Sequence, residues 1–270
     1  MRIRLLPAAL VLVVAVVLPA SRASASDFAV DVELVLAVDV SRSMTLRELE
    51  IQRRGYAAAL ASREVVEAIE TGGYGRIALT YVEWAGTALQ NVVIDWTLIA
   101  GRTDAEAFAA RLTASAPTSM QRTSISGALD FAVRRFDGNG YDGLRRVIDV
   151  SGDGPNNQGR PVTRARDDAV AQGIVINGLP LMTREGLGTQ WHLDDLDIYY
   201  RECVIGGPTA FMLPVVEWEH FQQAVRNKLV LELAGWPVPD PPAALLPASE
   251  SGYDCLIGEK IWDNLYGDWN

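Results

Sequence analysis

Hydrophobic residues recur along the chain in two alternating patterns. Short apolar runs are typical of strands buried on both faces of a sheet, and residues 32–38, 146–150 and 173–179 form three of them. Between these runs lie longer stretches whose apolar residues recur every three or four positions, as they do in amphipathic helices. We therefore predict helices over residues 45–70, 103–114, 125–136, 162–172 and 217–233.

Two further runs, 76–84 and 91–97, are separated by a short connection that contains glycine, and this favours an antiparallel pair of strands. A short strand is also predicted at 211–215. Strands separated by helices indicate a mostly parallel sheet covered on both faces. The expected fold is thus an α/β, doubly wound fold, with a mostly parallel sheet, one antiparallel edge strand and helices on both faces.

The N-terminal segment has the pattern of a secretory signal peptide. A basic start is followed by an apolar run from Leu5 to Ala20 and then by small residues up to Ala25, after which cleavage is expected. An uncleaved membrane anchor is the alternative, although the run is short for a span, which needs about 20 residues. We therefore predict an exported protein, periplasmic or secreted, with residues 1–25 as its signal peptide. The mature chain contains no second long apolar run, so no membrane span is expected in it.

After the signal peptide, residues 26–235 are predicted to form one domain. Residues 236–270 follow as a proline-rich linker and an aromatic tail. The only two cysteines are Cys203 and Cys255. In an oxidising compartment such an isolated pair favours a disulfide, which would hold the tail against the domain. Two unpaired, buried thiols are the alternative.

Charge narrows the classes of partner. The chain has 24 Lys and Arg against 34 Asp and Glu, which gives a formal net charge of −10. An acidic surface argues against binding to nucleic acid or anionic lipid, and favours cations or basic partners.

Oxygen-bearing side chains are concentrated at the expected carboxyl edge of the sheet, where open α/β sheets bind ligands. Asp39, Ser41 and Ser43 follow the first strand, Asp153 follows the strand 146–150, and Thr123 comes shortly before a predicted helix. Oxygen donors without His or Cys suit Mg²⁺, Mn²⁺ or Ca²⁺. Taken singly, such residues are also ordinary turn and helix-cap residues.

These five residues, in the pattern Asp-x-Ser-x-Ser, Thr and Asp-Gly, resemble the metal-ion-dependent adhesion site of von Willebrand factor A domains, such as integrin inserted domains. The resemblance in the order of elements covers roughly residues 31–235. It implies that the three hydroxyl side chains bind the metal directly and that the two aspartates act directly or through water. It also implies that a protein or peptide ligand presenting Asp or Glu completes the metal shell. The stretch Ser-Gly-Asp153-Gly departs slightly from the usual Thr-Asp-Gly.

Three other stretches, 200–207, 228–233 and 254–258, look like an exported bacterial family of undefined function with a von Willebrand factor A-like domain. The resemblance favours a binding module over an enzyme. A metal-dependent hydrolase is one alternative, with Asp153, Glu83 or the acidic run 194–197 as candidate general bases. The other alternative is a structural exported domain whose ion only stiffens the loops.

Overall fold

Five strands form one sheet in the computed structural model, which describes residues 27–114, 116–183, 192–234 and 252–266. The predicted signal peptide and most of the linker lie outside these residues. Along the sheet the order is β3-β2-β1-β4-β5. The strands are β1 (Phe28–Asp39), β2 (Ile77–Trp84), β3 (Gln90–Ile99), β4 (Tyr141–Gly152) and β5 (Ile174–Pro180).

Only β3 runs antiparallel to its neighbour, and the other three pairings are parallel. The predicted fold class is therefore confirmed. The register also matters for the site, because β1 and β4 are adjacent and Val38 pairs with Ser151. Residues that follow these two strands are therefore brought to the same edge of the sheet.

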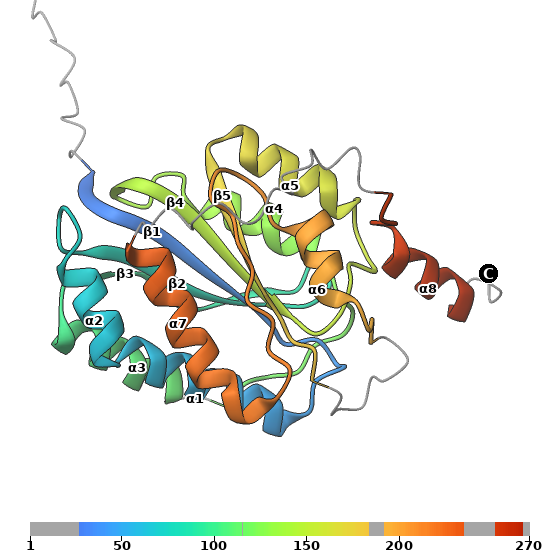
Figure 1. The fold of residues 1–270 in the computed structure, drawn as a ribbon, viewed down its shortest axis with the longest axis horizontal. Coiled ribbons are helices and arrows are strands. Elements are labelled where there is room, and N and C mark those ends of the chain that lie inside the picture. Colours follow the sequence, from blue (N-terminus) through green and yellow to red (C-terminus); the bar gives the residue numbers. More distant parts are fainter. Residues whose placement is uncertain (1–26, 115, 184–191, 235–251, 267–270) are drawn as a thin grey trace, which may run out of the picture.

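Helices cover both faces of the sheet, and each face has its own hydrophobic core (Figure 1). One face packs against α1 (Leu46–Leu60), α2 (Arg63–Glu70), α3 (Arg102–Thr113) and α7 (Phe221–Ala234). The other packs against α4 (Ile125–Arg135), α5 (Val162–Ala171), α6 (Leu196–Tyr199) and a π-helical turn, Tyr200–Val204. The last helix, α8 (Ile257–Tyr266), lies at one side of the molecule, beyond the two layers (Figure 1).

Two predicted elements differ from the structure. The helix expected over 45–70 is interrupted at Ser62, whose hydroxyl donates to the Ala59 carbonyl and accepts from the Val65 amide, so that it starts α2 as an N-cap. The strand expected at 211–215 forms only two isolated bridges, from Met212 to Gly178 of β5 and from Val215 to Leu181 just after β5. Pro214 lies inside that stretch and has no amide hydrogen for a strand ladder.

The predicted disulfide between Cys203 and Cys255 is formed. It joins the π-helical turn to the residue two positions before α8, and Tyr253 adds an edge-to-face ring contact with Tyr199. The C-terminal segment is therefore attached to the domain covalently as well as by packing. In the described part of the chain no helix is both long and apolar enough to cross a membrane.

Candidate metal site

The five predicted ligands come together at the carboxyl edge of the sheet. Asp39 ends β1, Ser41 and Ser43 lie in the loop before α1, Thr123 precedes α4, and Asp153 follows β4. All except Asp39 line one cavity of about 240 Å³. Asp39 is completely buried, so its carboxylate lies behind the lining residues.

A continuous set of hydrogen bonds links four of these side chains. The Ser41 amide donates to Asp39 Oδ1 at 2.7 Å, and the Ser41 and Ser43 hydroxyl oxygens are 3.0 Å apart. The Ser43 hydroxyl then donates to Asp153 Oδ1 at 2.8 Å. The two carboxylates are thus connected through the backbone amide of Ser41 and the hydroxyls of Ser41 and Ser43.

The two carboxylates are placed where a proton or a cation is favoured. Among the described residues Asp39 Oδ2 has no hydrogen-bond partner, although it is fully buried. Burial, and then the nearby charge of Asp153, raise the pKa of Asp39 well above its ordinary value. Burial also raises the pKa of Asp153 to about 6. A bound cation would offset both the desolvation and the mutual repulsion of these groups.

The chemistry of the donors fits a hard divalent ion. Within the described ranges no group of three or more His, Cys, Asp or Glu side chains is arranged to hold a metal. A metal at this edge would need donors besides carboxylates, and the serine hydroxyls beside Asp39 and Asp153 are candidates. Carboxylate and hydroxyl oxygens suit Mg²⁺, Mn²⁺ or Ca²⁺ rather than ions that prefer sulfur or imidazole.

Several positioning residues were not predicted from the sequence. Asn157 Oδ1 accepts from the Thr123 amide at 3.0 Å, and Asn156 Oδ1 accepts from the Ser126 amide at 3.0 Å. These bonds join the loop after β4 to the segment before α4. On the other side, Gln52 of α1 donates to the Asp39 carbonyl at 3.1 Å. Asparagines in a loop are ordinary turn residues, so nothing in the sequence singled these two out.

Tyr200 lies at the back of the site. A Cβ atom added to Gly152 would lie 2.9 Å from both Asp39 Oδ2 and the Tyr200 hydroxyl oxygen, so these two atoms lie close to the same glycine. Burial, and then the charge of Asp39, raise the pKa of Tyr200 well above its ordinary value. Tyr200 begins the π-helical turn, a rare element that is frequent at functional sites.

The candidate general bases have other partners. Glu83 is buried and forms an ion pair with Arg53, with Nε and Oε1 2.7 Å apart. Asp195, in the predicted acidic run, is hydrogen-bonded to Tyr253. Among the described residues that line the cavity, Asp153 is the only carboxylate.

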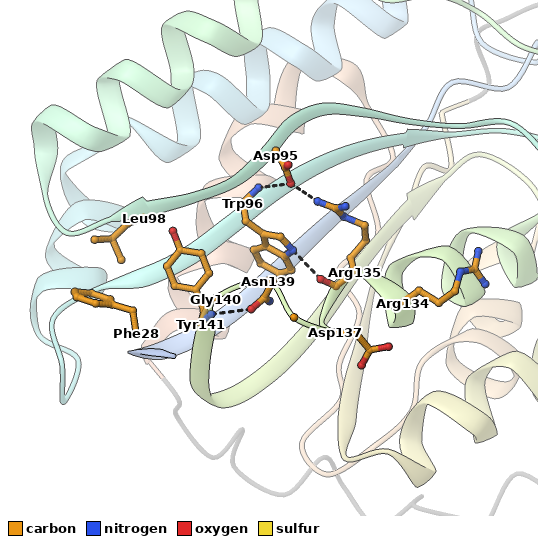
Figure 2. A pocket seen from close by; sticks show the side chains of 11 residues that line it. Phe28, Asp95, Trp96, Leu98, Arg134, Arg135, Asp137, Asn139, Gly140 and Tyr141 are labelled. Carbon is orange, nitrogen blue, oxygen red and sulfur yellow. Dashed lines mark hydrogen bonds and ion pairs between the residues drawn. The ribbon is translucent and has the colours of Figure 1, made fainter. Parts of the chain in front are cut away.

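A second, larger cavity lies at the opposite edge of the sheet (Figure 2). It has a volume of about 660 Å³ and includes Phe28 and Tyr141, which begin β1 and β4. Its polar groups largely satisfy one another, since the Trp96 indole donates to the Arg135 carbonyl at 2.8 Å and Asp95 is paired with the Arg135 guanidinium. It contains none of the predicted site residues.

The raised pKa values predict that the metal-free protein loses stability as pH rises. Asp39 and Asp153 bind protons more tightly in the folded chain than in the unfolded chain, so stability falls from about pH 4 through about pH 6. For Asp153 alone, a shift from 3.8 to about 6 corresponds to about 3 kcal/mol. Urea denaturation of chelator-stripped protein at about pH 3.5 and about pH 7.5 measures this effect.

Saturating Mg²⁺ should remove the part of that fall that comes from Asp39 and Asp153, because the ion stabilises their deprotonated carboxylates. Asp149, whose pKa is also raised, contributes with the same sign but lies outside the cavity. The part of the stability change with pH that depends on Mg²⁺ therefore reports on the site residues alone. A stripped protein that gained stability over this interval would contradict the assignment.

The chain is similar to one protein family and to several solved structures. The model of a family described as protein of unknown function (DUF1194) matches residues 29–237. No curated protein matches the chain significantly.

Among the solved structures, proximal thread matrix protein 1 from the mussel byssus superimposes with a TM-score of 0.55 at 15% identity, over 77% of this chain and 49% of that one. The pilus adhesin SpaC from Lactobacillus rhamnosus GG, in its open conformation, superimposes with a TM-score of 0.54 at 11% identity, over 76% of this chain and 30% of that one. A von Willebrand factor type A protein from Catenulispora acidiphila superimposes with a TM-score of 0.51 at 14% identity, over 76% of this chain and 43% of that one.

These likenesses confirm the predicted von Willebrand factor A fold. At such identities they show the fold alone. The chain also spans only about half the length of the mussel protein.

Proposed function

We propose that this chain, which belongs to the family described as protein of unknown function (DUF1194), is an exported module that binds a protein or peptide partner through a divalent metal ion. The observation that carries the proposal is the buried, unpartnered Asp39 Oδ2 beside two serine hydroxyls and a second carboxylate. Such an arrangement is costly for a metal-free protein and favourable for one that holds a cation.

In this proposal Ser41, Ser43 and Thr123 hold the ion directly, and Asp39 and Asp153 act directly or through water. Two aspartates balance a divalent charge, whereas hydroxyls add no charge. The bound ion supplies an electrophilic coordination position that an Asp or Glu of the partner can take. Mg²⁺ is the ion we favour, with Mn²⁺ and Ca²⁺ as alternatives.

Export is supported by the N-terminal pattern of residues 1–25 and by the disulfide, since disulfides persist in oxidising compartments. Residues 26–235 would act as the binding domain. Residues 236–270 would then be a tail tied back to it through Cys255.

A metal-dependent hydrolase is the second function that we considered. It needs a general base near the ion, and the buried ion pair with Arg53 engages Glu83. Asp153 is itself a predicted ligand. No observation therefore favours hydrolysis over binding.

Calorimetric titration of Mg²⁺, Mn²⁺ and Ca²⁺ into the exported, chelator-stripped protein tests the proposal. We expect saturable binding at one site, and acetate binding that depends on the metal. Ser41→Ala should lose both. Thr113→Ala, which changes an exposed hydroxyl at the end of α3, should lose neither. Acetate binding of equal strength in the presence of chelator would show that the carboxylate does not complete a metal shell.

A further inference from the structure

Helix α8 forms one wall of the candidate metal cavity. Gly258 and Trp262 line the same cavity as the predicted ligands. A Cβ at Gly258 would lie 2.1 Å from the Asn156 carbonyl oxygen, so the helix backbone rests directly on the loop after β4. The side-chain amide of Asn156 also donates to Glu259 Oε1 at 2.7 Å. The wall is therefore closely packed at this point.

Arg122 holds a guanidinium against that wall. Its charged group lies over the Trp262 ring, 3.4 Å from the ring centre, and the residue lines the cavity. The backbone of Arg122 has a φ of 71°, in the left-handed region that non-glycine residues rarely adopt. Strain of this kind persists only when surrounding contacts impose it, and it is concentrated at ligand sites.

The cavity contains a second arginine and an unusual balance of charge. Arg42, between two of the predicted ligands, is exposed and also lines the cavity. Among the described residues neither Arg42 nor Arg122 has a carboxylate at ion-pair distance. This is notable in a chain with a net charge of −10. With a divalent ion balanced by two aspartates, the arginines leave the cavity positively charged.

Resting on the proposed function, we infer that the cavity binds a short dicarboxylate, with one carboxylate at the metal and the other at Arg122. A guanidinium forms a two-pronged hydrogen bond with a carboxylate, and stacking on Trp262 orients it for this role. Arg122 and Thr123 are consecutive and line the same cavity, so an arginine and a predicted metal ligand face one space.

The size of the cavity limits the ligand to a small group. About 240 Å³ is below the roughly 300–1,000 Å³ of pockets for drug-sized molecules. Two sources supply the required chemistry. One is a free acid such as succinate, and the other is a polypeptide that ends in aspartate, where the terminal and side-chain carboxylates have the spacing of succinate.

Calorimetric titration of the exported, Mg²⁺-saturated protein with acetate and with succinate tests the inference. We expect succinate to bind at least about tenfold more tightly than acetate. Arg122→Gln should remove this preference, while saturable Mg²⁺ binding and metal-dependent acetate binding are both retained. Arg134→Gln, which removes an exposed arginine of α4 at the far cavity, is the matched control and should keep the preference.

Two further titrations distinguish a free dicarboxylic acid from a polypeptide that ends in aspartate. The tripeptide Ala-Ala-Asp with a free C-terminus should bind as tightly as succinate if the ligand is a chain end, and its C-terminal amide about tenfold more weakly. If the ligand is a free acid, succinate alone binds tightly. Either result supports the dicarboxylate site.

The Arg122→Gly variant tests the backbone strain at this position through stability, without any ligand. Glycine adopts a positive φ without strain, so this variant should unfold at a higher urea concentration than Arg122→Gln, while both lack the preference. A preference that survived in either variant would overturn the role of Arg122. Metal-dependent acetate binding without a preference for succinate in the parent would overturn this inference alone. Absence of any metal-dependent carboxylate binding would overturn the proposed function as well.

Discussion

Replacing Asp39 by asparagine is expected to abolish divalent-ion binding and, at the same time, to stabilise the metal-free protein. Asparagine has nearly the same shape, so the amide of Ser41 keeps its acceptor. It removes a charge that is completely buried and has one oxygen without a described partner. We expect a gain of about 1–3 kcal/mol in the free energy of unfolding without metal.

With Mg²⁺ present, the parent should be more stable than the Asp39→Asn variant. The parent gains stability from Mg²⁺ by mass action, whereas the Asp39→Asn variant gains none, because its affinity for the ion should fall at least about a hundredfold. Urea denaturation with chelator and with saturating Mg²⁺ measures both effects on the same two proteins.

Asp31→Asn is the matched control, because Asp31 lies near the start of β1 and Asp39 lies at its end. The Asp31 carboxylate accepts from the Tyr74 amide at 2.9 Å and the Arg76 amide at 3.2 Å, so its loss should destabilise the fold and leave Mg²⁺ binding intact. An Asp39→Asn variant that bound Mg²⁺ as the parent does would remove Asp39 from the site.

The second large effect is expected at Lys228 of α7, whose side chain is buried between that helix and the sheet. Its ammonium nitrogen lies 2.5 Å from both Asp149 Oδ1 on β4 and Glu232 Oε1 on the next turn of the helix. All three side chains are almost completely buried. Lys228→Met leaves two buried carboxylates without their cation, which should lower the free energy of unfolding by about 3–5 kcal/mol. Gln223→Met, at an exposed position of the same helix, should change it by less than about 0.5 kcal/mol.

The effect of Lys228→Met should depend on pH. Burial, and then the charge of Glu232, raise the pKa of Asp149 to about 7 in the folded parent. Without Lys228 the carboxyl of Asp149 should take up a proton more readily, which removes its repulsion of Glu232 at low pH. Urea denaturation at about pH 5 should therefore show a smaller loss than at about pH 8. A loss that was larger at the lower pH would show that the cluster is not held together by charge.

Local patterns were sufficient to predict the sheet and to place the five candidate ligand residues at one edge of it. The run 32–38 is buried on both faces, and the pairing of β1 with β4 brings Asp39 and Asp153 to one edge, as parallel topology requires. The ligands were predictable because each one directly follows a strand or precedes a helix. Their coordination of an ion remains a prediction.

Contacts between distant segments could not be predicted in this way. The periodicity of the closing helix indicates its apolar face, and Phe221 and Val225 are indeed buried, but a count of apolar residues places Lys228 and Glu232 outside the core. Only their partner Asp149, on a strand, explains why they are inside. Likewise, nothing near Arg122 in the sequence indicates that Trp262 lies against it.

The wall formed by α8 has a consequence for the order of events during biosynthesis. The five predicted ligands and the whole sheet are translated before residue 252, whereas Gly258 and Trp262 come later and are attached through Cys255. A chain that stops early, or one whose cysteines stay reduced, thus has the ion-binding loops without a secured wall. If the chain is exported as we propose, the cavity is fully assembled only when translation and disulfide formation are complete, which limits ligand capture inside the reducing cytoplasm.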